Sequence, residues 1–155
     1  MFSADHDRTL EVLDEEECRR LLGTAVIGRL ALTERALPTI HPVHFVVAGD
    51  RLVIPTRMGS KAAFASRGAV VAFEADDFDP AGRVGWNVTV IGPSRVVVDP
   101  AEIAVLDGLG VRAWAPSEQP CYITVQLSLV QGRRITVTAH GSHAGPEVLL
   151  AGSSE

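Results

Sequence analysis

The chain has 155 residues, a formal net charge of −5 and 46% hydrophobic residues, so one domain of this size can bury a core without a disulfide or a metal. Its basic residues are one lysine and thirteen arginines, and nothing in their distribution suggests the clustered cations that nucleic-acid binding requires. No apolar run reaches the roughly 18 residues of a membrane span, and the N-terminus lacks the profile of a signal peptide. We therefore expect a soluble, cytoplasmic protein with no nucleic-acid or membrane partner.

The first half of the chain alternates short helical and strand patterns. Residues 14–23 open on an aspartate N-cap, carry an acid three residues later and close on a glycine, which predicts a short helix. Residues 26–33 and 37–47 are apolar stretches around a short turn and predict the two strands of a hairpin. A third strand over 51–56 has a proline near its end, as is typical of a sheet edge, and a second helix is predicted over 60–66.

The second half is dominated by strand patterns. A Gly-Pro pair inside the longest of them indicates a bend or a bulge, and an aspartate followed by proline indicates a helix start. The predicted elements are a buried strand over 69–74, a polar loop over 76–82, a long strand over 85–98, a helix over 99–109, and a last hairpin of strands 122–130 and 134–138 around Gln131-Gly132.

These patterns predict a mainly β protein with a few short helices. They amount to about six or seven mostly antiparallel strands, and closure into a β-barrel would hide the strand edges that such a sheet leaves exposed. Residues 1–139 are expected to form a single domain. The remaining residues, 140–155, are rich in small and polar side chains and are expected to form a flexible C-terminal tail.

No metal site or disulfide is predicted. Cys18 and Cys121 stand far apart without a CxxC or Cys/His spacing, so both are expected to be packing residues in a reducing compartment. His41 and His44 are three residues apart on a predicted strand. Because side chains alternate faces along a strand, these two histidines point to opposite sides and cannot readily share one metal ion.

The most informative local feature is the turn between a strand end and a helix start. Thr56 and Arg57 end the strand, Gly59 turns the chain, and Ser60 and Lys61 begin the helix. Hydroxyls, cations and the unpaired N–H groups of a helix start favour an anion. It is not a Walker loop, because the upstream glycine is missing and the lysine follows the serine. The turn predicts a phosphate cradle, and an ordinary capped helix with a solvated lysine is the alternative.

Six segments of the chain match one family pattern in order and spacing. They are IHPVHFVV at 40–47, LVIPTRMGSKAA at 52–63, VVAFE at 70–74, GWNVTVIG at 85–92, VVVDPAE at 96–102 and GRRI at 132–135. Together they resemble the core of the pyridoxamine 5′-phosphate oxidase-like, FMN-binding split barrels. Within that family the chain is most similar to the branch that contains the nitroimidazole-resistance proteins.

The resemblance implies FMN bound between two identical subunits, with no residue assigned a catalytic role. It places Thr56, Arg57, Ser60 and Lys61 at the phosphate, Pro42, Val43, His44 and Phe45 along the isoalloxazine ring, Trp86 and Asn87 near the ring across the dimer interface, and Arg134, with Arg133 and Trp114, near the substrate face.

The function implied is that of an FMN-dependent oxidoreductase acting on a small molecule. Pro55 stands where the nitroimidazole-resistance branch tends to carry a histidine, so nitroreduction is not implied for this chain. The C-terminal arginine and histidine pattern of true pyridoxamine 5′-phosphate oxidases is also missing. A deazaflavin-dependent reductase and a non-catalytic flavin- or haem-binding module remain alternatives.

Overall fold

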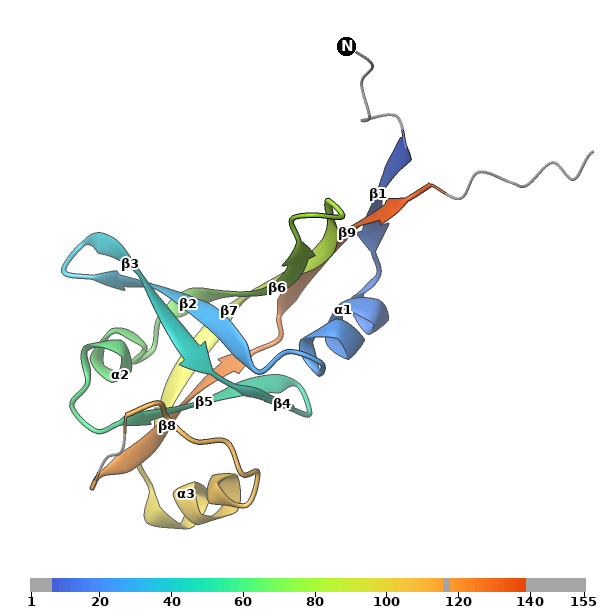
Figure 1. Cartoon of the computed structure of the whole chain (residues 1–155). Helices are drawn as coiled ribbons and strands as arrows, with labels where there is room; N and C mark the ends of the chain where they lie inside the picture. The colour runs from blue at the N-terminus through green and yellow to red at the C-terminus, as the bar shows by residue number, and fades with distance from the viewer. Residues whose placement is uncertain (1–6, 116–117, 139–155) are drawn as a thin grey trace, which may run out of the picture.

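The computed structural model describes residues 7–115 and 118–138 of the chain, and within them the protein forms nine strands and three helices (Figure 1). The tail predicted over 140–155 lies outside the described residues. The elements are β1 (Arg8–Leu13), α1 (Glu15–Leu22), β2 (Ile27–Glu34), β3 (Leu37–His44), β4 (Val46–Ala48), β5 (Arg51–Arg57), α2 (Lys61–Ala65), β6 (Val70–Asp79), β7 (Val84–Val97), α3 (Pro100–Asp107), β8 (Pro120–Gln126) and β9 (Leu129–Val137).

All strand pairs are antiparallel, and the long strand β7 joins two sheets. The order β3-β2-β6-β7-β8-β5-β4 runs along the hydrogen-bonded path, and β9 pairs with both β1 and β7. The first part of β7 pairs with β9, whereas its last residues, Ser94 to Val97, pair with β8. One strand therefore turns the sheet around the core, which gives the mainly β, barrel-like architecture that the sequence predicts. The number of strands is nine, against six or seven predicted.

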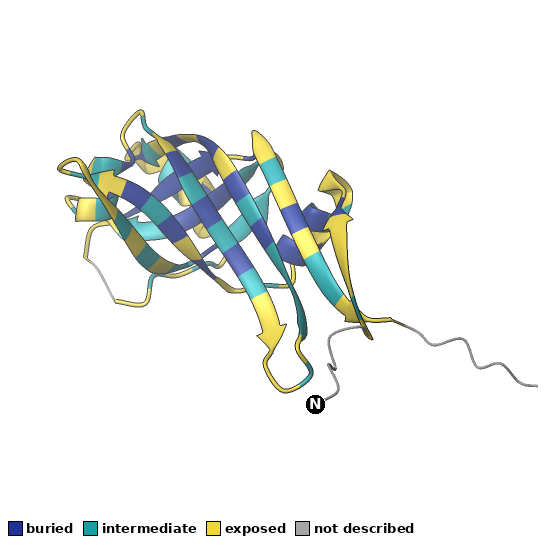
Figure 2. Cartoon of the chain, turned by 90° about the horizontal axis from the view of Figure 1, so that it is seen from above, coloured by how far each residue is buried: buried dark blue, intermediate teal, exposed yellow. Residues whose placement is uncertain are grey.

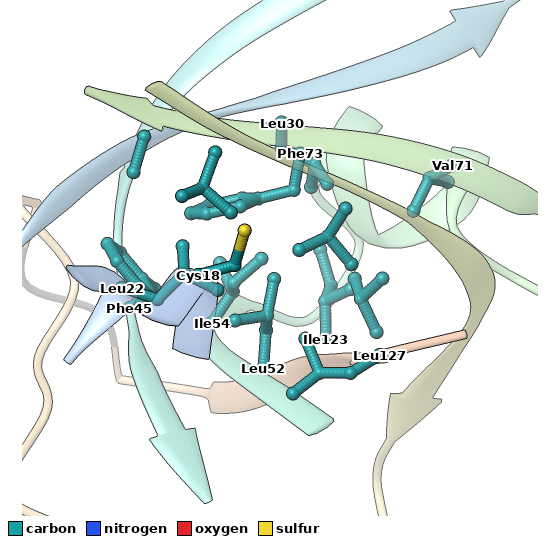
Figure 3. Close-up of a cluster of buried hydrophobic side chains, with 14 of the residues drawn as sticks. Cys18, Leu22, Leu30, Phe45, Leu52, Ile54, Val71, Phe73, Ile123 and Leu127 are labelled. Atoms are coloured by element: carbon teal, nitrogen blue, oxygen red, sulfur yellow. The ribbon is translucent and has the colours of Figure 1, made fainter. Parts of the chain in front are cut away.

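The core lies between the two sheets and is closed at one end by α1. Phe73, Leu30, Ile54 and Ile123 are fully buried and come from four different strands (Figure 3). Leu22 of α1 packs into the same cluster. Buried and exposed residues alternate along the strands, as expected when one face of a sheet contacts the core (Figure 2).

The three predicted helices are confirmed, and each has the N-cap that the sequence indicates. Asp14 accepts a hydrogen bond from the Glu17 amide at 2.8 Å, Ser60 caps α2, and Asp99 accepts from the Glu102 amide at 3.2 Å. Each cap satisfies an amide that has no partner within its helix.

The first predicted hairpin is confirmed as β2 and β3, but its second strand, predicted over 37–47, ends at His44, and Val46–Ala48 form β4, which pairs with β5. Arg35 and Ala36 connect β2 to β3 with positive φ angles of 49° and 63°, as in the tight turns that match strand twist. Pro55 also lies where one side of its strand is unpaired, as the sequence predicts. The neighbouring strand β4 pairs with β5 only as far as Val53, so the missing N–H of Pro55 leaves no ladder bond unmade.

The predicted hairpin of 122–130 and 134–138 is wrong. Gln131 and Gly132 lie inside β9, and β9 pairs with β1 and β7 instead of β8. The glycine serves close packing: a Cβ at Gly132 would lie 2.6 Å from the Cys18 sulfur of α1. The strand β1 is not among the predicted elements, and it pairs with β9 along its whole length.

The predicted polar loop over 76–82 is wrong in its first half. Asp76 to Asp79 extend β6 and pair with the start of β7, so only the turn at 80–83 is a loop. The interruption predicted in the strand over 85–98 is a change of partner within a continuous strand. At this point a Cβ on Gly92 would lie 2.0 Å from the Gln126 carbonyl oxygen of β8.

Within residues 7–115 and 118–138, none of the helices is both long enough and apolar enough to cross a membrane.

Candidate functional site

A groove of about 830 Å³ lies between α2 and the tip of the β2–β3 hairpin. Its volume is within the range of small-molecule sites in proteins. One wall comes from the hairpin, the opposite wall from the turn after β5 and from α2, and the floor from the end of β7. The lining residues are Thr33, Glu34, Arg35, Leu37, Thr39, Met58, Gly59, Ser60, Lys61, Ala63, Phe64, Ala65, Arg67, Val96, Val98 and Cys121.

The predicted phosphate cradle forms one edge of this groove. Gly59 adopts a φ of 74°, which turns the chain from β5 into α2. Ser60 Oγ accepts a hydrogen bond from the Ala63 amide at 3.0 Å and lies 2.9 Å from Thr56 Oγ1. Ser60 and Lys61 line the groove. Thr56 does not line it but contacts Ser60 through its hydroxyl. Arg57 is exposed at the end of β5 and does not line the groove.

The groove carries an excess of positive charge. Arg35, Lys61 and Arg67 line it together with a single carboxylate, that of Glu34. Glu34 Oε1 lies 2.7 Å from His41 Nε2, so this acid already has a partner on β3. The sequence did not point to Arg35, which is part of a hairpin turn, or to Arg67. Only the folding of the β2–β3 hairpin over α2 brings Arg35 to the groove, whereas Arg67 lies just after the end of α2.

His44 and Trp114, both named by the family resemblance, meet beside a second cavity. Their rings are 4.8 Å apart in an edge-to-face arrangement. This cavity of about 590 Å³ lies between the β5–β8 sheet and the segment after α3, and Thr56, Trp114 and Tyr122 line it. Tyr122 Oη donates a hydrogen bond to Asp107 Oδ1 at 2.7 Å. Burial, followed by this bond, raises the pKa of Tyr122 to about 12, so the phenol stays protonated.

The four residues predicted along the ring do not share one environment: Pro42 is exposed, Val43 packs partly against the core and His44 is half-buried. Pro42 and Val43 lie on β3 opposite Arg29 and Gly28 of β2, and His44 ends the strand. The Phe45 side chain, in contrast, is buried in the core with its ring 4.7 Å from that of Phe73. The Phe45 side chain therefore packs in the core, and the residue also lines a third, more open cavity beside His44.

Trp86, Asn87 and Arg134 lie on two paired strands, away from the groove, and Trp86 packs partly against the core. Trp86 and Asn87 on β7 pair with Arg134 and Arg133 on β9. In the described part of the chain, none of them lines the groove or the two further cavities. The structure thus separates Trp86, Asn87 and Arg134 from the predicted residues at the groove and at the cavities beside Trp114.

Arg134 is held by acids of its own subunit. Its guanidinium contacts the Glu17 carboxylate of α1 and lies 4.0 Å from Glu11 of β1. Arg20, and after it Arg134, lower the pKa of Glu17 to about 2. This network fixes α1 against β9.

A carboxyl pair lies on the outer side of β6. Glu74 and Asp76 point to the same side, and Arg29 Nη1 of β2 lies 3.8 Å from Glu74 Oε1 and 3.5 Å from Asp76 Oδ2. Glu74 Oε1 is buried and accepts no hydrogen bond. Burial, and then the neighbouring Asp76 carboxyl, raise the pKa of Glu74 to about 7 against the opposing effect of Arg29.

Replacing Glu74 by glutamine is expected to stabilise the protein at pH 8 by about 1 kcal/mol and to leave it nearly unchanged at pH 5. A carboxyl whose pKa is raised on folding favours the folded state below its unfolded pKa and loses that contribution as the pH rises through about 7. One pKa unit corresponds to about 1.4 kcal/mol, and partial exposure of this side chain screens part of the effect. Urea unfolding at the two pH values measures it.

Asp77→Asn is the control for Glu74→Gln, because Asp77 is an exposed acid on the same strand. Equal pH responses of the two variants would contradict the role of the buried pair.

Comparison with known proteins identifies relatives over most of the chain. The family model described as pyridoxamine 5′-phosphate oxidase matches residues 14–134. The uncharacterized protein Rv0080 of Mycobacterium tuberculosis is 37% identical over 133 residues, which are 83% of this chain and 87% of that protein.

Solved structures of relatives share the fold. The FAD binding protein of Mycobacterium smegmatis is 31% identical, covers 80% of this chain and 98% of its own, and superposes with a TM-score of 0.67. A candidate pyridoxamine 5′-phosphate oxidase of Corynebacterium glutamicum is 26% identical, covers 84% of this chain and 96% of its own, and superposes with a TM-score of 0.71.

Proposed function

Because the chain belongs to the pyridoxamine 5′-phosphate oxidase family, we propose that it binds a flavin nucleotide with the phosphate in the groove beside α2. The observation that carries this proposal is the charge of the groove. Three cations line it, and its single acid is already paired with His41. Such a site attracts an anion of the size and charge of a nucleotide phosphate. The FAD binding relative of Mycobacterium smegmatis supports a flavin as the ligand.

The residues present fit this ligand by their chemistry. Lys61 and Arg35 would neutralise the phosphate, and the Ser60 hydroxyl, whose lone pair serves the Ala63 amide, can still donate its proton to a phosphate oxygen. Pro42 and Val43 of β3, with His44 at its end, would line the ring. We take FMN as the ligand, since it is the smallest flavin that carries this phosphate.

We propose further that the protein is a flavin-dependent oxidoreductase. When bound, a flavin supplies hydride or single-electron transfer, and the protein orients it and limits the access of water. The cavity beside the His44–Trp114 pair adjoins Thr56 and is the place for a small-molecule substrate. Trp114 offers a flat apolar surface there, and the Tyr122 phenol remains neutral.

A second subunit would complete the site. Trp86, Asn87 and Arg134 belong to the family pattern but lie outside the groove of their own subunit. In a homodimer with the cofactor at the interface, the residues of one subunit can approach the cofactor bound mainly by the other. This arrangement accounts for the separation of the two groups of residues.

Titration of the purified protein with FMN, followed by quenching of flavin fluorescence, tests the proposal. We expect a Kd in the micromolar range or below, corresponding to about −8 kcal/mol or better. Parallel titrations with FAD and with a deazaflavin rank the three cofactors. No binding of any of them at millimolar concentration would overturn the proposal. Stopped-flow mixing of the loaded protein with NADH, NADPH or a reduced deazaflavin then tests for reduction of the flavin.

A further inference from the structure

The groove beside α2 contains one carboxylate among three cations. Glu34, at the end of β2, lines the groove together with Arg35, Lys61 and Arg67. A carboxylate on the wall of an anion site opposes the binding of a phosphate, because like charges repel each other. It can also pair with the cations of the site and so compete with the ligand for them. The effect of Glu34 on a bound anion therefore depends on where its carboxylate is held.

The Glu34 carboxylate is held by His41 of β3, the second strand of the hairpin. The His41 Nε2 atom lies 2.7 Å from Glu34 Oε1, and because a carboxylate only accepts hydrogen bonds, His41 is the donor. The Glu34 side chain is 19% exposed and the His41 side chain 34%, so the contact is partly shielded from water. His41 is not among the residues that line the groove. It therefore contacts the carboxylate from the hairpin and not from within the groove.

The cations of the groove, in contrast, are not paired with acids. In the part of the chain that the structure describes, Arg35, Lys61 and Arg67 form no ion pair. Arg35 directly follows Glu34 in the sequence, and Lys61 lines the same groove, so a Glu34 carboxylate without its hydrogen bond has cations with which to pair. The bond to His41 thus separates the acid of the groove from its cations and leaves the cations to a ligand.

We propose that His41 is a positioning residue of the phosphate site. By holding the Glu34 carboxylate, it prevents this acid from occupying the cations that bind the phosphate. His41 acts through Glu34 and does not itself contact the ligand. The inference rests on the proposed function, because it requires an anionic ligand in the groove. It adds to that function the residue that keeps the cations of the groove available.

A double-mutant cycle on Glu34 and His41 tests the proposal, with the Kd of FMN as the measured quantity. His41→Leu is expected to weaken FMN binding about five- to tenfold, because the released carboxylate competes with the phosphate for Lys61 and Arg35. Glu34→Gln removes the negative charge and is expected to strengthen FMN binding about two- to threefold. In the double variant the effect of His41→Leu is expected to disappear, so that its FMN affinity lies within about twofold of that of Glu34→Gln.

Three controls distinguish this role from a structural one. His41→Gln keeps an N–H donor for Glu34 and is expected to bind FMN within about twofold of the unmodified protein. Riboflavin, which lacks the phosphate, is expected to bind His41→Leu and the unmodified protein alike, whereas a distorted hairpin would weaken the binding of both ligands. Glu102→Gln makes the same change of charge at the Arg95–Glu102 ion pair, away from the groove, and is expected to change FMN affinity less than about twofold.

Circular dichroism checks that each variant is folded. Should His41→Leu fail to fold, His41→Phe replaces it in the cycle, since it also lacks the donor and keeps an aromatic ring. A double variant that binds FMN as weakly as the single His41 variant would overturn the proposal, and so would a folded His41→Leu variant with full FMN affinity or with an equal loss of riboflavin affinity.

Failure of this inference and failure of the proposed function give different results. If Lys61→Gln weakens FMN binding while the Glu34 and His41 variants leave it unchanged, the phosphate site stands and the role of His41 is wrong. If the unmodified protein binds no flavin, the proposed function is wrong and this inference falls with it.

Discussion

Replacing Lys61 by glutamine is expected to weaken flavin-nucleotide binding roughly 10- to 150-fold. A hydrogen bond to a charged group contributes roughly 1.5–3 kcal/mol, and Lys61 is the only lysine of the chain, positioned at the groove edge beside Ser60. Glutamine keeps most of the side-chain length and removes the charge. The substitution leaves the Ser60 cap of α2 in place, so the fold is expected to persist. Fluorescence titration with FMN measures the change.

Arg51→Gln is the matched control for Lys61→Gln. Arg51 is a cation at the opposite end of β5 and does not line the groove, so its replacement is expected to change FMN affinity less than about twofold. Lys61→Arg keeps the charge and is expected to retain much of the affinity. An FMN affinity that is the same in Lys61→Gln and in the unmodified protein would place the phosphate elsewhere. Equal losses of FMN affinity in Lys61→Gln and Arg51→Gln would show that the effect comes from the overall charge of the protein and not from the groove.

Replacing Gly92 by alanine is expected to destabilise the protein by about 3 kcal/mol. The added Cβ would lie 2.0 Å from the Gln126 carbonyl oxygen and 3.0 Å from the carbonyl carbon of the same residue. Both are backbone atoms of β8, next to the point where β7 passes from one sheet to the other. Neither strand can move without breaking ladder hydrogen bonds, so the cost is at the upper end of that for overpacked sites. Urea unfolding at constant m-value measures it.

Gly49→Ala separates this steric effect from the loss of a glycine as such. Gly49 lies in the β4–β5 turn with a φ of 60°, and a Cβ there would meet nothing within 4 Å. Its replacement is expected to cost only the strain of the left-handed conformation, about 1–2 kcal/mol. If Gly92→Ala were less destabilising than Gly49→Ala, the close approach of β7 and β8 would not be a constraint on the fold.

Several features of this protein are determined by residues that are close in sequence. The helix starts at Asp14, Ser60 and Asp99 were predictable, because a cap bonds an amide three residues ahead and needs nothing from the rest of the chain. The same holds for the cradle. Thr56, Gly59 and Ser60 interact with one another within one turn, so the sequence could predict their proximity, and the family pattern could predict that Lys61 follows them at the groove.

Other features were decided only by tertiary structure, because they depend on which strands become neighbours. A glycine in a sequence indicates either a turn or a close approach, and only the tertiary structure shows that Gly132 lies inside β9 with Cys18 of α1 packed against it. Arg35 lines the groove only because the β2–β3 hairpin lies over α2. Ile40 and Leu129 belong to one apolar row across five strands only because of the strand register, since the two residues are far apart in the sequence. Local chemistry thus determined the caps and the cradle, whereas strand pairing determined which side chains of distant segments meet at the groove.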